Sequence, residues 1–148
     1  MIREAALEDL DHLVDLEGQS FSGDLLSRRN FRHLLTRGNS QTLLAIQDGE
    51  VAGYVTVLFR CPSAKARLYS IAVRPAYRAC GIGTQLVRAA ERTASERGCS
   101  SMRLEIRSDN EASISLFEGL GYRRGGLTGG YYEDGMSAVR FERCLDQA

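Results

Sequence analysis

Hydrophobic residues in the first quarter of the chain recur at helical spacing in two segments. In residues 7–17 the spacings of three and four predict a helix with one apolar stripe, and Gly18 is expected to end it. Residues 27–38 repeat the pattern, with Ser27 as the expected N-cap and Gly38 as the stop. The first stripe consists of Leu7, Leu10, Leu13, Val14 and Glu17.

The next part of the chain changes to the pattern of β-strands. Residues 41–60 predict two strands joined at Asp48-Gly49, a dipeptide typical of tight hairpin turns. Residues 66–74 are rich in apolar and β-branched side chains and are closed by Pro75, which has no amide to donate to a sheet. Three consecutive strands are therefore expected here.

Helices and strands alternate in the remainder. Residues 82–97 predict an amphipathic helix that stops at Gly98, and residues 100–107 alternate as a strand with Met102, Leu104 and Ile106 on one face. Residues 109–122 predict a short helix ended by two glycines, and a closing pair of strands follows. The apolar face of strand 100–107 is expected to be buried.

This element order predicts a mixed α/β fold, in which about four helices flank one mixed, mostly antiparallel sheet. The length of 148 residues matches a single domain, spanning residues 1–148. A hairpin in the middle of the chain excludes a doubly wound parallel sheet.

Charge and cysteine content narrow the possible partners. Nineteen basic and nineteen acidic residues cancel, so no general field attracts nucleic acid or an anionic membrane. The apolar stretches are far shorter than the ~20 residues of a membrane helix, and the charged start does not fit a secretory leader. Cysteines 61, 80, 99 and 144 share no ligand spacing with the two histidines. We expect a cytoplasmic protein with free thiols and no metal, nucleic-acid or membrane partner.

The stretch "RACGIG", residues 78–83, places two glycines at the start of a predicted helix. Unpaired amides at a helix N-terminus form an anion site, and glycine allows a close approach of the anion. The Walker loop is excluded because no Gly-Lys-Ser or Gly-Lys-Thr follows, and Leu86 replaces the third glycine of the dinucleotide fingerprint. Two interpretations remain for this segment alone: a phosphate loop, or a turn that only tightens a strand–helix junction.

The segment "IAVRPAYRACGIG" resembles the pyrophosphate-binding segment of the GCN5-related N-acetyltransferases, which transfer acetyl from acetyl-CoA to an amine. Residues 104–122, "LEIRSDNEASISLFEGLGY", resemble the second half of that family, particularly its protein N-terminal and ribosomal-protein-alanine acetyltransferases. The resemblance implies acetyl-CoA as co-substrate and an amine acceptor, with a peptide N-terminus favoured. The implied cofactor-binding residues are Ile71, Val73, Arg78, Ala79, Cys80, Gly81, Ile82, Gly83, Thr84, Asn110 and Phe117.

The resemblance also implies a catalytic base. By strand alternation Glu105 points away from the apolar face, together with Arg103 and Arg107. From the residues alone, a solvated, charge-balanced strand face is the favoured interpretation of these three. In the N-terminal acetyltransferases the matching glutamate is the proposed general base, and here we expect it to act through a water molecule.

One position departs from the family pattern. Those enzymes commonly carry a tyrosine as general acid where this chain has Phe117, whose ring has no proton to give. Tyr132, Tyr131 and Tyr69 are the candidate replacements, with Tyr132 preferred, or the thiolate leaves with solvent assistance. Ser113 replaces an alanine of the family, and we interpret it as a packing change.

Two other functions stay open at this point. The acceptor can be a small-molecule amine, or the chain can be a CoA-binding sensor or interaction module without turnover, as Phe117 would allow. The tyrosine pair of "YYEDG" and the segment around residues 18–31 are expected to wall the acceptor site. The sequence does not distinguish a monomer from a homodimer.

Overall fold

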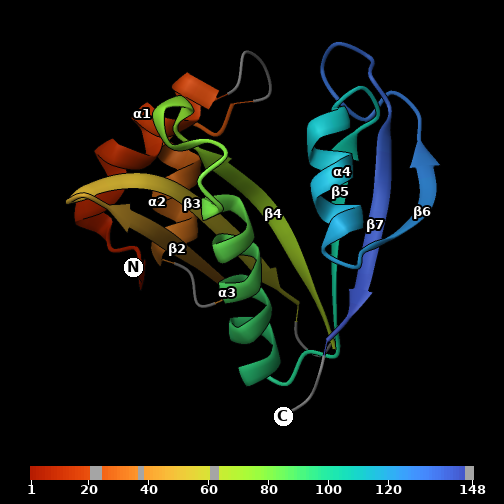
Figure 1. Cartoon of the computed structure of the whole chain (residues 1–148), viewed down its shortest axis with the longest axis horizontal. Helices are drawn as coiled ribbons and strands as arrows, with labels where there is room; N and C mark the ends of the chain where they lie inside the picture. Colours follow the sequence, from red (N-terminus) through yellow and green to blue (C-terminus); the bar gives the residue numbers. More distant parts are fainter. Residues whose placement is uncertain (21–24, 37–38, 61–63, 146–148) are drawn as a thin grey trace.

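A computed structural model describes residues 1–20, 25–36, 39–60 and 64–145. Its centre is a seven-stranded sheet in which β4 and β5 run parallel and every other neighbouring pair runs antiparallel (Figure 1). The predicted mixed, mostly antiparallel sheet is therefore confirmed. From one edge to the other, the strands are β1 (Ile2–Glu4), β2 (Ser40–Gln47), β3 (Glu50–Phe59), β4 (Lys65–Val73), β5 (Ser101–Arg107), β7 (Ala138–Cys144) and β6 (Arg123–Thr128).

Four α-helices cover the two faces of this sheet, as the sequence predicts. Helices α1 (Leu10–Ser20) and α2 (Arg28–Thr36) pack on one face through a smaller buried cluster that includes Tyr54. Helices α3 (Ile82–Glu96) and α4 (Glu111–Gly119) contribute to a larger cluster on the other face. The two helix pairs thus form separate layers on opposite faces of the sheet.

Several local predictions can be compared directly with the backbone. The hairpin turn at Asp48-Gly49 is confirmed, with φ of 53° and 78° at its two residues. Met102, Leu104 and Ile106 are buried, as the alternation predicts. Cys80, Cys99 and Cys144 are free thiols, whereas Cys61 and the predicted helix stop at Gly38 lie outside the described residues. Within the described ranges, no helix is long and apolar enough to cross a membrane.

The predicted end of the first helix is wrong. Helix α1 continues past Gly18 to Ser20, and Leu7 lies in a preceding 3-10 turn (Leu7–Asp9) with its side chain exposed rather than in the core. Gly18 has no positive φ, whereas Gly98, which does follow the end of α3, has a φ of 85°. A glycine ends a helix where it takes the left-handed conformation, and Gly18 does not take it.

The sheet separates in its middle, and this separation creates the site. Strands β4 and β5 pair only over Lys65–Arg67 and Ser101–Arg103, beyond which they diverge (Figure 1). A bulge in β4 at Tyr69 accompanies the separation, because Leu68 and Ser70 face consecutive residues of β3. The bulge shifts the alternation, so that Leu68 and then Ile71 point to the α3 side. Both features leave strand edges open between the two halves of the sheet.

Candidate active site

A groove of about 610 Å³ lies between β4, the start of α3 and α4. All of the cofactor-binding residues predicted from the sequence line this groove except Cys80, which is exposed beside it. Those that line it are Ile71, Val73, Arg78, Ala79, Gly81, Ile82, Gly83, Thr84, Asn110 and Phe117. Residues from two separate motifs therefore meet at one cavity.

The loop before α3 has the backbone conformation of an anion site. Gly81 is the N-cap with a φ of 80°, and Ala79 takes a φ of 65°, which is uncommon for a residue with a side chain. In this fully described stretch no side chain caps the helix, and its first turn contains no acidic residue. The first amides of α3 thus point out of the helix with a partial positive charge.

Gly83 keeps the floor of the groove open. A Cβ built at this position would lie 3.7 Å from Leu116 and 4.0 Å from Val73, so any larger side chain would extend into the cavity. Backbone donors at such an uncrowded helix start are suited to an anion such as the diphosphate of a CoA thioester. These residues therefore fit the ligand that the sequence resemblance implies.

A second cavity, of about 320 Å³, lies beside the first and opens on the side of the acidic and tyrosine residues. Ile71, Asn110, Ser113 and Phe117 line both cavities, so they mark the junction between them. Phe117 is 1% exposed and packs edge-to-face on Tyr122, and the Asn110 side chain caps α4 by accepting a hydrogen bond from the Ser113 amide at 3.1 Å. The junction is therefore held by fixed side chains.

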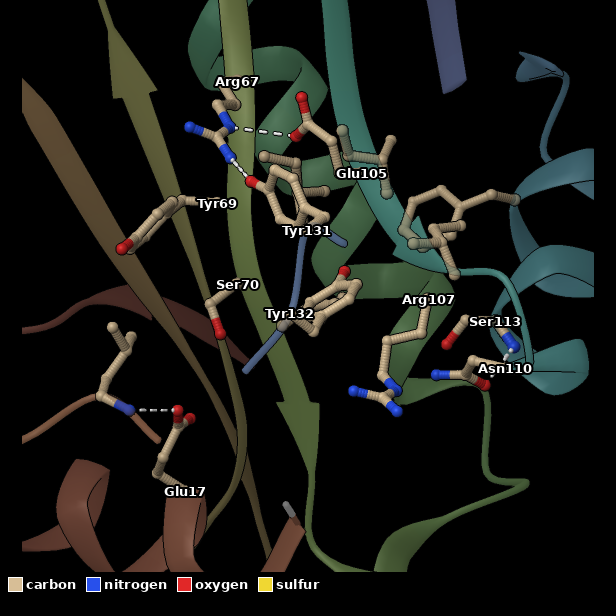
Figure 2. Close-up of a pocket in the computed structure, with 16 residues that line it drawn as sticks. Glu17, Arg67, Tyr69, Ser70, Glu105, Arg107, Asn110, Ser113, Tyr131 and Tyr132 are labelled. Atoms are coloured by element: carbon tan, nitrogen blue, oxygen red, sulfur yellow. Dashed lines mark hydrogen bonds and ion pairs between the residues drawn. The ribbon is translucent and has the colours of Figure 1, made fainter. Parts of the chain in front are cut away.

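Glu105 projects from β5 into this second cavity, which we name the acceptor pocket (Figure 2). Its side chain is only 10% exposed and accepts a hydrogen bond from Nε of Arg67 at 3.1 Å. Another nitrogen of that guanidinium donates to the Tyr131 hydroxyl at 2.6 Å. Glu105 is thus a positioned carboxylate in a cavity and does not belong to an open, solvated strand face.

The tyrosine pair reaches the acceptor pocket from the loop between β6 and β7. Tyr131 and Tyr132 pack against each other with their ring centroids 4.9 Å apart, and the Arg107 guanidinium lies 4.9 Å from the Tyr132 ring (Figure 2). Arg107 also pairs with Asp134 at 2.5 Å, which lowers the pKa of that carboxyl group. The ion pair connects the tyrosine loop to the end of β5.

Glu17 lines the opposite side of the acceptor pocket, and we did not predict it as a site residue. It is 3% exposed and accepts hydrogen bonds from the Tyr54 hydroxyl at 2.6 Å and from the Leu26 amide at 2.8 Å. The Tyr54 hydroxyl is also 2.6 Å from the Ser70 hydroxyl. Burial raises the pKa of the Glu17 carboxyl, which the two hydrogen bonds partly offset. This polar chain joins α1, β3, β4 and the chain before α2.

Three residues of the pocket are marked in the sequence by patterns that we did not assign to the site. Glu17 is an acid on the apolar stripe of a helix, and Arg67 is a charge within an otherwise apolar strand. Ser113 lies one helical turn before Phe117, so both occupy the same face of α4 at the junction of the cavities. We predicted only a packing role for Ser113, whereas its side chain lines both cavities.

Comparison with known proteins gives the same family from a family model and from individual relatives. Residues 7–122 match the family described as Acetyltransferase (GNAT) family. An N-alpha-acetyltransferase RimI from Mycobacterium tuberculosis is 33% identical over 139 residues, covering 91% of this chain and 86% of the relative. A putative [ribosomal protein bS18]-alanine N-acetyltransferase from Bacillus subtilis is 29% identical over 133 residues, covering 90% and 87%.

Solved structures show the same fold. The ribosomal-protein-S18-alanine N-acetyltransferase from Escherichia coli superposes with a TM-score of 0.89 at 24% identity, covering 100% of this chain and 95% of that one. Ard1 from Thermoplasma volcanium gives a TM-score of 0.90 at 22% identity, covering 99% and 97%. The seven-stranded sheet and its covering helices are therefore shared with these proteins.

Proposed function

Since this chain belongs to the GNAT family and is an N-acetyltransferase, we propose that it transfers acetyl from acetyl-CoA to the α-amino group of a protein or peptide. One observation carries the proposal. The groove at the start of α3, which we name the cofactor groove, and the acceptor pocket meet at the separation of β4 and β5, with Glu105 on the acceptor side. Relatives that are N-alpha-acetyltransferases support the choice of a peptide acceptor.

The cofactor groove supplies the position of the thioester. In our proposal the amides from Ala79 to Thr84 hold the diphosphate, and the open edge of β4 at Ile71 and Val73 binds the pantetheine arm. Acetyl-CoA supplies an activated acyl carbon, from which CoA thiolate departs. The single domain over residues 1–148 would then contain both substrate sites.

The acceptor pocket supplies the base. An α-amino group has a reference pKa of about 8, so part of it is neutral at pH 7, whereas a lysine amine near 10.4 needs far more help. Glu105, fixed by Arg67, takes the amine proton through a water molecule as the new C–N bond forms and the C–S bond breaks. A weak base suffices for an N-terminal amine, which favours that acceptor.

The departing thiolate needs a proton, and Phe117 offers none. We propose Tyr132 as the donor, since its ring lines the acceptor pocket beside Arg107. Ser113 is a second candidate because it lines both cavities at the junction, where the thioester would lie. A thiolate is also a good leaving group, so solvent provides a baseline rate in the absence of either hydroxyl.

Turnover on a panel of amines tests this function. Peptides with free N-termini, the same peptides with blocked N-termini and one internal lysine, and small amines such as polyamines are incubated with acetyl-CoA, and products are identified by mass spectrometry. We expect acetylation at free N-termini. Preferred acetylation of a small amine would show that the acceptor is a small molecule and not a peptide. Thermal stabilisation by acetyl-CoA without any acetylated product would instead indicate a CoA-binding module.

A further inference from the structure

A larger groove of about 1120 Å³ adjoins the acceptor pocket. The two cavities share Leu26, Arg67 and Tyr69, and the larger one extends over the first half of β4 between α2 and β5. A polypeptide whose first residue occupies the acceptor pocket has this groove as an adjoining path. An extended chain advances by about 3.3–3.6 Å per residue, so a few residues beyond the first span the distance between neighbouring cavities.

The charged side chains among the described residues that line this groove are all basic. No acidic residue is among the described residues that line it, although the whole chain has a net charge of 0. Lys65 pairs with Glu142 and Arg67 pairs with Glu105, while Arg97 lies 4.1 Å from the Phe59 ring. The basic lining residues are His33, Arg60, Lys65, Arg67, Arg97 and Arg103.

From this charge distribution we infer that the acceptor is an acidic peptide, with Asp or Glu residues following its amino terminus. The inference rests on the proposed function and specifies its substrate class. The described lining of the groove carries several basic side chains and no acidic one, so its charge is complementary to carboxylates at the third and later positions of the acceptor. Charge complementarity of this kind contributes mainly to partner choice and to the association rate.

A nucleic acid is the other polyanion that such a groove could attract. The observations favour a peptide, because the groove adjoins the acceptor pocket and shares three lining residues with it. A nucleic-acid surface typically accompanies a strongly basic domain, whereas this chain is neutral as a whole. Binding of RNA is therefore an outcome of the test.

The test compares peptides that share their first two residues and differ only at the third to sixth positions, which are all Glu, all Ser or all Lys. We expect kcat/KM to be about tenfold higher for the Glu peptide than for the Lys peptide at low salt, since several exposed charge pairs each contribute modestly. The ratio should shrink as ionic strength rises, because the Debye length falls from about 10 Å at 0.1 M to about 3 Å at 1 M.

A charge reversal within the groove provides the matched variant. For Arg103→Glu, we expect the ratio of kcat/KM for the Glu peptide to kcat/KM for the Lys peptide to fall to one or below. For Arg103→Gln, we expect the logarithm of this ratio to fall by about half as much. Arg92→Glu makes the same charge change on an exposed position of α3 outside the groove, and the ratio should remain that of the parent protein. Circular dichroism checks that each variant is folded.

The outcomes separate this inference from the proposed function. Acetylation of all three peptides at equal rates would overturn the acidic preference and leave the N-terminal activity intact. Equal peptide rates together with salt-sensitive binding of a mixed-sequence RNA that Arg103→Glu abolishes would assign the groove to nucleic acid. Failure to acetylate any peptide would overturn the function and the inference together.

Discussion

The two cavities that meet at the open middle of the sheet are built in different ways. The cofactor groove is formed mainly by one continuous segment, residues 71–84, and by one face of α4 with its N-cap Asn110. The acceptor pocket is formed by side chains from several segments that are far apart in the sequence, among them Glu17, Arg67, Glu105 and Tyr132. Backbone conformation therefore determines the first cavity, and side-chain chemistry determines the second.

This difference explains which site could be predicted from the sequence. A glycine-rich turn followed by a helix is local, so its residues could be placed together from the sequence, and the family resemblance then assigned them to the cofactor. Glu17 and Arg67 meet the site only through tertiary structure, because they come from α1 and β4, which are distant in the sequence. Substitutions in the two cavities should accordingly change different kinetic quantities.

The largest expected effect is on the acceptor side. Glu105→Gln keeps the shape of the side chain but removes the proposed base, so kcat should fall by about 100- to 1000-fold. Acetyl-CoA affinity, measured by calorimetry, should be unchanged. The exposed Glu118→Gln is the matched control with normal turnover. Full activity of Glu105→Gln would remove this residue from the mechanism, and a parallel loss of acetyl-CoA binding would show that the two cavities are not separable.

Substitutions in the cofactor groove should mainly change the affinity for acetyl-CoA. Gly81→Val places a β-branched residue at a φ of 80°, a left-handed conformation that costs about 1–2 kcal/mol per residue. The loop is expected to rearrange, and the acetyl-CoA dissociation constant to rise by about tenfold or more. Gly18→Ala is the control: it replaces a helical glycine with no neighbour within 4 Å, and thermal unfolding should show stabilisation of about 0.5–1 kcal/mol. Unchanged binding by Gly81→Val would mean that the loop conformation does not govern the site.

Substitutions at the junction between the cavities test how clearly effects on turnover separate from effects on acetyl-CoA affinity. Tyr132→Phe should lower kcat by about tenfold if its hydroxyl donates the proton, and Tyr131→Phe, beside it, should change kcat far less. Ser113→Ala tests the alternative donor. A loss confined to Ser113→Ala would move the proton donor from the β6–β7 loop to α4, and normal kcat in all three variants would leave solvent as the donor.

The smallest effect concerns the buried Glu17. Its raised pKa means that the folded state retains a proton that the unfolded state has lost, so stability falls as pH rises from about 4.5, the reference value, through the raised pKa. Glu17→Gln removes this dependence. The free energy of unfolding of the variant, relative to the parent protein, should therefore increase between pH 4 and pH 7 in urea titrations. The exposed Glu118→Gln should show no such trend, and a flat difference for Glu17→Gln would contradict the assigned pKa direction.

The sequence predicted most of the fold because its elements follow local rules. The hairpin at Asp48-Gly49, the apolar face of β5 and the end of α3 at Gly98 each depend on a few neighbouring residues. The predicted helix end at Gly18 is wrong because it depends on tertiary packing and not on neighbouring residues alone. Glycine tolerates several conformations, and the buried residues around it in α1 keep the backbone helical there.

The bulge at Tyr69 could not be predicted from alternation. A regular strand would place Arg67, Tyr69 and Ile71 on one face, whereas the extra residue sends Ile71 toward the α3 side. Arg67 therefore faces Glu105 while Ile71 serves the cofactor groove. One irregular residue allows a single strand to contribute to both cavities.

The short pairing of β4 with β5 has a further consequence for aggregation. Beyond Arg67 and Arg103 each strand has an open edge inside the sheet, and exposed edges of this kind readily add a strand from another molecule. Here α4 and the Tyr131–Tyr132 loop lie beside the opening, which limits access by a foreign chain. The opening is thus an inner edge in addition to the outer edges at β1 and β6, and a ligand bound there would block the pairing of a foreign strand at that inner edge.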